Sequence, residues 1–247
     1  MRKIGARVYG MSACAFGLML FAYSAGFLGN VILPKTIDSG SVVATDAAFA
    51  INALLIFLFA VQHSAMARPA LRRWLAVRVS PIGAQGIYLF VTGITLSAVF
   101  LFWRPIPEVI WSVESPYLKM TLWAVCAMGW SIAILTAATV YHRQWPGMEK
   151  AAIFAPDELG RISDFQIPFF YKHVRNPFYL GLIIAFWVTP HMSVGHFMFS
   201  AFITAYIVIE IYFEECDLIR QFGHAYLDYR RRVPMLIPRL RRAVDEL

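Results

Sequence analysis

The sequence contains a stretch rich in aromatic and basic residues, Tyr171-Lys172-His173-Val174-Arg175-Asn176-Pro177-Phe178-Tyr179-Leu180-Gly181. A mostly apolar stretch follows it, and a second polar run then begins at Glu214-Glu215. An apolar helical hairpin that enters a bilayer and returns brings the polar runs at its two ends to the same membrane face. The pattern therefore predicts a membrane-embedded helical hairpin with a polar cluster at its open end.

The rest of the chain has the composition of a helical membrane protein. Of its 247 residues, 59% are hydrophobic and only 15% are charged, whereas soluble proteins carry about 25% charged residues. The apolar residues gather in long uncharged runs, which indicates membrane-spanning helices. The six apolar segments are Val8–Leu33, Ala47–Val61, Ile82–Trp103, Tyr117–Val140, Phe178–Thr189 and Phe197–Phe213.

These segments predict an all-α fold: a polytopic helical integral membrane protein with five to six transmembrane segments and no Rossmann domain. The second segment spans a bilayer only if Gln62 to Met66 continue its helix. The last two segments are short and are joined by the polar stretch His191 to His196, so they form the hairpin. We expect a single domain with four transmembrane helices in 1–140, a cytoplasmic loop in 141–176, the hairpin in 177–213, and a cytoplasmic C-terminal helix and tail in 214–247.

The basic residues predict the orientation of the helices. Most of the 22 Lys and Arg residues fall on one side of the segments, while Lys35, Arg104 and Lys119 fall on the other. Because basic connections stay in the cytoplasm, both termini are predicted to be cytoplasmic in a multi-pass membrane protein. The formal net charge of +7 is then explained by topology and by contact with anionic membrane lipids. Nucleic acid is not an expected partner.

Several common site patterns are absent from the sequence. It contains no HExxH pair, Walker loop, GxGxxG fingerprint, GxSxG elbow or CxxCH haem motif. Its cysteines, Cys14, Cys126 and Cys216, are far apart, which argues against a disulfide or a zinc site. The sequence therefore predicts no metal centre.

The two polar runs together resemble the signature of the membrane-embedded methyltransferases, which include isoprenylcysteine carboxyl methyltransferase, the phospholipid methyltransferases and the NnrU group. Further matches within residues 50–238 make the bacterial methanethiol S-methyltransferases the most similar group. The matching residues are Gln62-His63-Ser64, Met66-Ala67-Arg68-Pro69, Trp103-Arg104-Pro105, Thr189-Pro190 and Val194-Gly195-His196. The resemblance implies a helical enzyme that uses S-adenosylmethionine (SAM) and methylates a small thiol, methanethiol, to give dimethyl sulfide. Such a thiol is expected to enter from the bilayer.

The first polar run has groups that suit such a cofactor. Arg175 lies just before Pro177, in the first turn of the predicted fifth helix, where a carboxylate meets a guanidinium and the positive end of the helix dipole. Tyr171 and Tyr179 could stack on adenine or face the sulfonium, and Gly181 could allow close approach of the cofactor or of a neighbouring helix. The predicted cofactor-binding residues are Tyr171, Arg175, Asn176, Pro177, Tyr179, Gly181, Glu214, Glu215, Tyr229 and Arg231.

One position departs from the family pattern, which usually has Arg-His-Pro where this chain has Arg175-Asn176-Pro177. Asn can bind a cofactor but cannot accept a proton from the thiol. Three other residues are candidate proton acceptors, with no preference among them: His142, Glu214 and Tyr226.

The acidic residues also have a structural interpretation. Glu210, Glu214, Asp217 and Gln221 share one helical face, and Glu215 points elsewhere. Glu214 and Glu215 could simply pair with Arg72, Arg73 or Arg231 and join the cytoplasmic helix ends. Two alternatives to thiol methylation also remain: a prenyl-cysteine carboxylate or a lipid amine as the acceptor, or a non-catalytic NnrU-like membrane protein or transporter.

Overall fold

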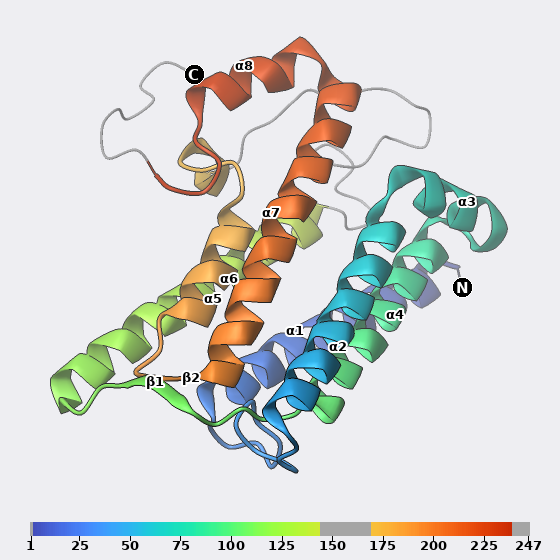
Figure 1. The fold of residues 1–247 in the computed structure, drawn as a ribbon. Helices are drawn as coiled ribbons and strands as arrows, with labels where there is room; N and C mark the ends of the chain where they lie inside the picture. The colour runs from blue at the N-terminus through green and yellow to red at the C-terminus, as the bar shows by residue number, and fades with distance from the viewer. Residues whose placement is uncertain (1, 144–168, 239–247) are drawn as a thin grey trace. The chain divides into compact units, whose positions relative to one another are not determined.

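The computed structural model describes residues 2–143 and 169–238, without the side chains of residues 2–11, 13, 14, 81, 82 and 140–143. The described residues are almost entirely helical (Figure 1), so the predicted all-α fold is confirmed. The helices are α1 Arg2–Gly29, α2 Thr45–Ala67, α3 Pro69–Val79, α4 Pro81–Phe102, α5 Pro116–Arg143, α6 Pro177–Trp187, α7 Val194–Phe222 and α8 His224–Arg232. The other elements are β1 Val109–Ser112, β2 His191–Ser193 and the 3-10 helix η1 Phe169–Lys172.

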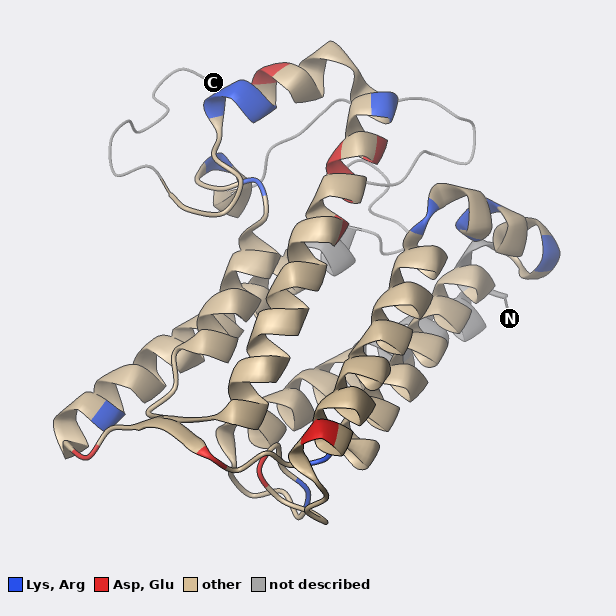
Figure 2. Cartoon of the chain, in the orientation of Figure 1, with Lys and Arg blue, Asp and Glu red and all other residues tan. Residues whose placement is uncertain are grey.

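The long helices have the length and composition of membrane spans. Within the described residues, four candidate spans lie at 45–67, 83–102, 116–139 and 194–222, and shorter apolar helices lie at Ala15–Gly29 and Pro177–Trp187. Lys and Arg lie at the ends of the long helices and in the connections (Figure 2). The chain is therefore a membrane protein. Its number of crossings stays a prediction.

Two helices extend beyond the apolar segments that the sequence analysis identified. The helix α2 continues through Gln62–Met66 to Ala67, as a full span required. The apolar segment Phe197–Phe213 lies within α7, which has 29 residues and ends at Phe222. This helix therefore includes Glu214, Asp217 and Gln221, which the sequence analysis placed on one helical face. Glu214 and Glu215 therefore lie within α7.

The described residues form two compact units, which are considered separately: unit 1, from 1–120 and 189–206, and unit 2, from 121–188 and 207–247. In unit 1, α4 packs against α1, α2 and α3. Its core is aromatic: the ring centroids of Phe27 and Phe100 are 4.9 Å apart, and those of Trp103 and Phe199 are 5.7 Å apart. This packing fixes the end of α4 beside the start of α7.

The polar join before α7 contains a strand that the sequence analysis did not predict. In unit 1, β2 pairs antiparallel with β1, with Trp111 opposite Met192 and Ser112 opposite His191. The Trp111 indole donates a hydrogen bond to the Thr189 carbonyl at 3.1 Å. Because both strands are very short, they lack the alternating pattern that identifies a strand in a sequence.

In unit 2, α5 and α6 approach each other through two glycines. A Cβ atom on Gly181 would lie 2.6 Å from the Gly129 carbonyl oxygen and 2.7 Å from the Ala133 nitrogen. A Cβ atom on Gly129 would lie 2.7 Å from the Ala185 nitrogen. The backbones of the two helices are therefore in direct contact, as small residues permit between membrane helices.

We expect Gly181→Ala to lower the free energy of unfolding by about 1–3 kcal/mol, because the new methyl group meets backbone atoms that cannot rotate away. Gly17→Ala is the matched control, since a Cβ atom there meets nothing within 4 Å. In that helix the change should be neutral or stabilising by up to about 1 kcal/mol. SDS-induced unfolding in mixed micelles measures both. Equal effects of the two variants would contradict the close contact between α5 and α6.

The turn from α7 to α8 brings three segments of unit 2 together. Gly223 has a φ of 56° and donates its N–H to the Ile219 carbonyl at 2.9 Å, which ends α7 and redirects the chain. The helix α8 then packs Tyr226 and Tyr229 against Leu218 and Val233. The C-terminal end of α7, α8 and the start of α6 consequently surround one polar cluster.

Candidate functional site

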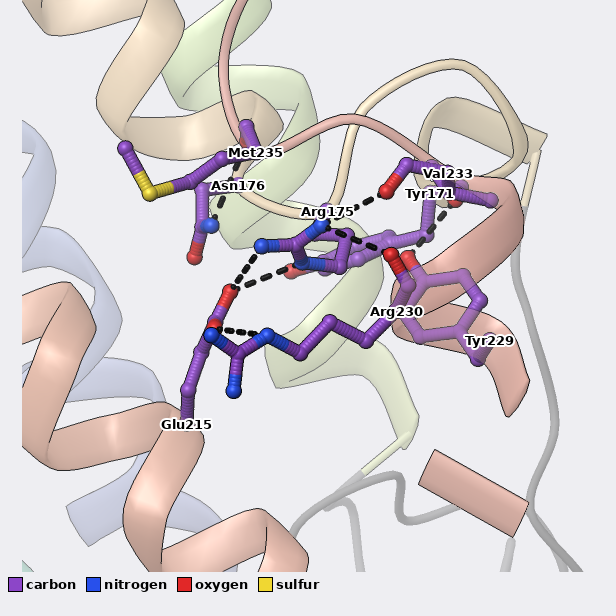
Figure 3. A network of polar contacts seen from close by, with 8 residues as sticks. All are labelled: Tyr171, Arg175, Asn176, Glu215, Tyr229, Arg230, Val233 and Met235. Atoms are coloured by element: carbon purple, nitrogen blue, oxygen red, sulfur yellow. Dashed lines mark hydrogen bonds and ion pairs between the residues drawn. The ribbon is translucent and has the colours of Figure 1, made fainter. Parts of the chain in front are cut away.

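At the centre of this cluster, Arg175, which lies two residues before α6, forms a buried ion pair with Glu215 of α7. Arg175 Nε and Nη2 each lie 2.7 Å from Glu215 Oε1 (Figure 3). The two side chains are only 9% and 7% exposed. Two short bonds from one guanidinium to one carboxylate make this a charge-assisted contact of the strong kind.

The remaining donors of Arg175 hold the segment that follows α8. Arg175 Nη1 donates to the Val233 carbonyl at 2.7 Å and to the Arg230 carbonyl at 3.2 Å. The Arg175 backbone N–H donates to the Pro234 carbonyl, and both the N–H and the side-chain amide of Asn176 donate to the Met235 carbonyl. Thus Arg175 and Asn176 tie residues 233–235 to the start of α6.

A second arginine reaches the same carboxylate from α8. Arg230 Nε lies 3.3 Å from Glu215 Oε2, and the Arg230 side chain is 49% exposed. Apart from Glu215, the Arg230 side chain has no ion-pair partner among the described residues. Arg230 is therefore a half-exposed cation at the edge of the cluster, held by a carboxylate that it shares with Arg175 (Figure 3).

Four tyrosines lie around the ion pair. The Tyr229 hydroxyl donates to the Tyr171 carbonyl at 2.7 Å, and the rings of Tyr226 and Tyr229 are 5.7 Å apart. The Tyr179 hydroxyl donates to Glu214 Oε2 at 3.4 Å. The half-buried Glu214 carboxylate and these rings form an aromatic, partly dehydrated surrounding for the charged groups.

The phenols of this cluster keep their protons at neutral pH. Burial raises the pKa of Tyr171, and the Glu214 carboxylate raises it further. Burial also raises the pKa of Tyr226, with the Glu215 carboxylate adding to the effect and Arg175 opposing it. The pKa of Tyr229 is raised by burial and by its neighbour Tyr226. These tyrosines are therefore hydrogen-bond donors, and Tyr226 is a poor proton acceptor.

The raised pKa values predict a loss of stability in alkali. In the unfolded chain these phenols ionise near pH 10. Below about pH 10 the phenols are protonated in both states, and their full contribution to stability is present. As pH rises above about 10, the unfolded chain releases protons that the folded chain retains, so the free energy of unfolding falls. Thermal unfolding between pH 8 and 11 measures this. Tyr229→Phe should make the decline shallower, and the same change at the exposed Tyr117 should not; identical slopes would contradict the prediction.

The structure brings most of the residues predicted from the sequence into this cluster. They are Tyr171, Arg175, Asn176, Tyr179, Glu214, Glu215, Tyr226 and Tyr229. Pro177 is the first residue of α6. Binding of a cofactor by these residues stays a prediction.

Three predicted residues are placed differently. Gly181 faces α5, as the helix-packing interpretation expected. The exposed Arg231 lies 3.4 Å from Asp228 of its own helix. The His142 side chain lies outside the described residues. The expected pairing of Glu215 with arginine does occur, but its partners are Arg175 and Arg230 and not Arg72, Arg73 or Arg231.

Sequence reasoning missed one part of the cluster and left another undecided. The carbonyls of Val233, Pro234 and Met235 act as acceptors, and a backbone acceptor leaves no signature in residue types. Either Arg230 or Arg231 could bind a cofactor carboxylate or a lipid phosphate by sequence alone, and the sequence did not separate them. The position of Arg230 on α8, one residue after the buried Tyr229, was the available signal. Among the described residues, no group of three or more His, Cys, Asp or Glu side chains is arranged to hold a metal ion.

Comparison with known proteins finds full-length relatives. The chain is 41% identical to methanethiol S-methyltransferase 2 of Bradyrhizobium diazoefficiens, and the match covers 99% of the chain and 95% of that protein. It is 35% identical to methanethiol S-methyltransferase of Mycobacterium tuberculosis over 94% of the chain and 95% of that protein. A more distant match, at 28% identity over 62% of the chain and 56% of that protein, is Nurim of Xenopus laevis. No protein-family model matches the chain.

Proposed function

The chain belongs to the methanethiol S-methyltransferase family, and from this we propose that it transfers a methyl group from SAM to methanethiol, giving dimethyl sulfide, within a membrane. The observation that carries the proposal is the 41% identity to methanethiol S-methyltransferase 2 over 99% of the chain. A match of that extent includes both polar runs and the helices between them. The acceptor and the donor are the parts of the proposal that need direct measurement.

The residues of the cluster fit SAM. Its methionine carboxylate needs an accessible cation, and Arg230 is half-exposed with Glu215 as its one ion-pair partner among the described residues. Arg175, which the sequence analysis favoured, has its donors on Glu215, Val233 and Arg230. We therefore assign the carboxylate to Arg230, and we assign to Arg175 the role of holding Glu215 and the C-terminal segment in place.

The tyrosines suit the cationic end of the cofactor. SAM, when bound, supplies an electrophilic methyl group on a sulfonium. The aromatic faces of Tyr171, Tyr226 and Tyr229 attract such a cation, and their burial keeps water from competing with the thiol. Asn176 is buried, with its amide on the Met235 carbonyl, so it supports the pocket wall and takes no proton.

Glu214 is our proposed proton acceptor for the thiol. Thiolate is the effective nucleophile, so a base must remove the proton before or during attack on the methyl carbon. The raised pKa of Tyr226 makes its phenol a donor, whereas Glu214 is a half-buried carboxylate that accepts a hydrogen bond from Tyr179. The Tyr179 hydroxyl orients this carboxylate.

We also propose that the cluster lies at the cytoplasmic face of the bacterial inner membrane, where SAM is available, with both termini in the cytoplasm. The basic residues Arg175, Arg220 and Arg230–Arg232 near the cluster support this orientation by the positive-inside rule. Methanethiol, being small and apolar, would reach the cluster from the bilayer.

The test is methyl transfer by membranes that contain the full chain. With methanethiol and methyl-labelled SAM, labelled dimethyl sulfide should accumulate in the headspace, and membranes without the chain should produce none. Labelled prenyl-cysteine peptide or labelled phospholipid, with no dimethyl sulfide, would assign a different acceptor. The absence of turnover with all three acceptors, together with no SAM binding by calorimetry, would favour a non-catalytic membrane protein.

The role of Arg230 has its own matched pair of variants. Arg230→Gln removes a charge-assisted contact, so the KM for SAM should rise about ten- to a hundredfold. Arg231→Gln makes the same charge change on the same helix, at a residue whose one ion-pair partner in the described part of the chain is Asp228, and should leave the KM for SAM unchanged. Equal effects of the two variants would remove Arg230 from the cofactor site.

A further inference from the structure

Two basic side chains of unit 1 lie together, well away from the arginines at the other end of α2. The side chain of Asn52, in the second turn of α2, bonds both the N–H and the carbonyl of Arg104 at 2.8 and 2.7 Å. Arg68 follows the end of α2 sixteen residues later, which is about 24 Å along a helix. Arg104 and its neighbour Lys35 therefore belong to the end of unit 1 that the orientation argument placed outside the cytoplasm.

Lys35 is held beside Arg104 without a carboxylate. Its ammonium donates to the carbonyls of Ser39 and Trp103, and Trp103 directly precedes Arg104. Burial lowers the pKa of Lys35, and the Arg104 charge lowers it further. The nearby Asp38 carboxylate is occupied by Asn30 and Ser193. Two like charges thus stay together with no ion pair to a described carboxylate.

The Arg104 guanidinium is short of acceptors. Its Nη1 donates to the Ser41 hydroxyl at 2.9 Å, and no described residue accepts a hydrogen bond from Nη2. Its Nε is buried and also has no acceptor. The guanidinium therefore has donor capacity beyond its contact with Ser41, and an anion is the acceptor that best suits it beside the second positive charge of Lys35.

The adjacent loop presents apolar side chains outward. Ile32 has a φ of 68° and is fully exposed, at 101%, and Val31 is also exposed. A β-branched residue in the left-handed region is strained, and strain of this kind is kept where the surroundings or a ligand require it. At the end of α4, Leu101 and Phe102 are exposed as well. A ligand at this place would therefore meet two cationic donors and exposed apolar side chains.

We propose that Lys35 and Arg104 bind the phosphate group of a bilayer phospholipid, whose acyl chains lie against Val31, Ile32 and the end of α4. The phosphate takes hydrogen bonds from the Lys35 ammonium and from Arg104 Nη2, and it balances the two like charges. Phosphate is a suitable acceptor for a guanidinium and an ammonium that are already held in place. Free inorganic phosphate offers the same chemistry without the acyl chains.

The test is native mass spectrometry of the delipidated full chain in detergent, with phosphatidylglycerol, diacylglycerol and inorganic phosphate as separate probes. The wild-type chain should retain phosphatidylglycerol tightly and should not retain diacylglycerol. The Lys35→Gln, Arg104→Gln double variant should bind one fewer phosphatidylglycerol, or bind it about tenfold more weakly. Lys119→Gln is the matched control: it removes a basic charge on the same predicted side, at a lysine 3.9 Å from Glu114.

Each outcome decides the proposal. Equal retention of phosphatidylglycerol by the wild type, the double variant and Lys119→Gln overturns it. Inorganic phosphate is the alternative ligand. If it displaces phosphatidylglycerol at equal affinity and no longer binds to the double variant, the site binds free phosphate and not a lipid. Asn52 bonds the backbone of Arg104, so Arg104→Gln leaves this link between α2 and the end of α4 intact. If the double variant does not fold, the single variants Arg104→Lys and Lys35→Gln are compared. Arg104→Lys should retain phosphatidylglycerol, and Lys35→Gln should bind it more weakly. The opposite order of affinities refutes the site.

Discussion

Replacing Arg175 with alanine is expected to lower the free energy of unfolding by about 3–5 kcal/mol, because it leaves a buried carboxylate without its principal partner. Glu215 would keep only the longer contact to the half-exposed Arg230. The carbonyls of Val233 and Arg230 would lose their donor. SDS-induced unfolding in mixed micelles measures the loss. The affinity for SAM, measured by calorimetry on the fraction that stays folded, should fall as well, since residues 233–235 are no longer held against α6.

Two further variants distinguish the effect of breaking the ion pair from a general effect of removing charged residues in this part of the chain. Arg220→Ala removes an exposed arginine of α7 whose partner, Asp217, is three residues away on the same helix, and it should change stability by less than about 1 kcal/mol. The double change Arg175→Met, Glu215→Met removes both buried charges and should recover much of the lost stability. A single Arg175→Ala variant as stable as the wild type would contradict the role assigned to the pair.

Replacing Glu214 with glutamine is expected to lower kcat for methyl transfer about 10²- to 10⁴-fold, the usual contribution of a general base. Glutamine preserves the shape of the side chain and still accepts the hydrogen bond from Tyr179, so the free energy of unfolding should not change. The residual rate should rise with pH as thiolate forms in solution. The rate at which dimethyl sulfide accumulates in the headspace, measured between pH 6 and 9, gives kcat and its dependence on pH.

The neighbouring acids are the controls for Glu214. Asp217→Asn makes the same chemical change in α7 at a carboxylate that pairs with Arg220, and it should retain kcat. Glu215→Gln should lower stability together with activity, because it breaks the contacts with Arg175 and Arg230. Full activity of Glu214→Gln would leave His142, or the free thiolate itself, as the explanation for deprotonation.

The sequence by itself determined the class of fold and, to within about three residues, the ends of α4, α5 and α6. The segment Ile82–Trp103 was predicted and α4 is Pro81–Phe102; the segment Tyr117–Val140 was predicted and α5 is Pro116–Arg143. A bilayer demands a minimum apolar length, so composition along the chain is enough to locate a span. The resemblance of the two polar runs to the membrane methyltransferases was likewise confirmed by relatives that match the full chain.

Only the tertiary structure decided which groups meet within the polar cluster. Residue types predicted that Arg175 would bind a negative group, but they could not show that Glu215 and two backbone carbonyls already satisfy the guanidinium. They also could not separate Arg230 from Arg231, which differ in whether α8 turns them toward Glu215 or toward Asp228. The choice of partner depends on distances between α6, α7 and the chain after α8, which are set by the turn at Gly223 and by packing. These distances have no counterpart in the order of the residues.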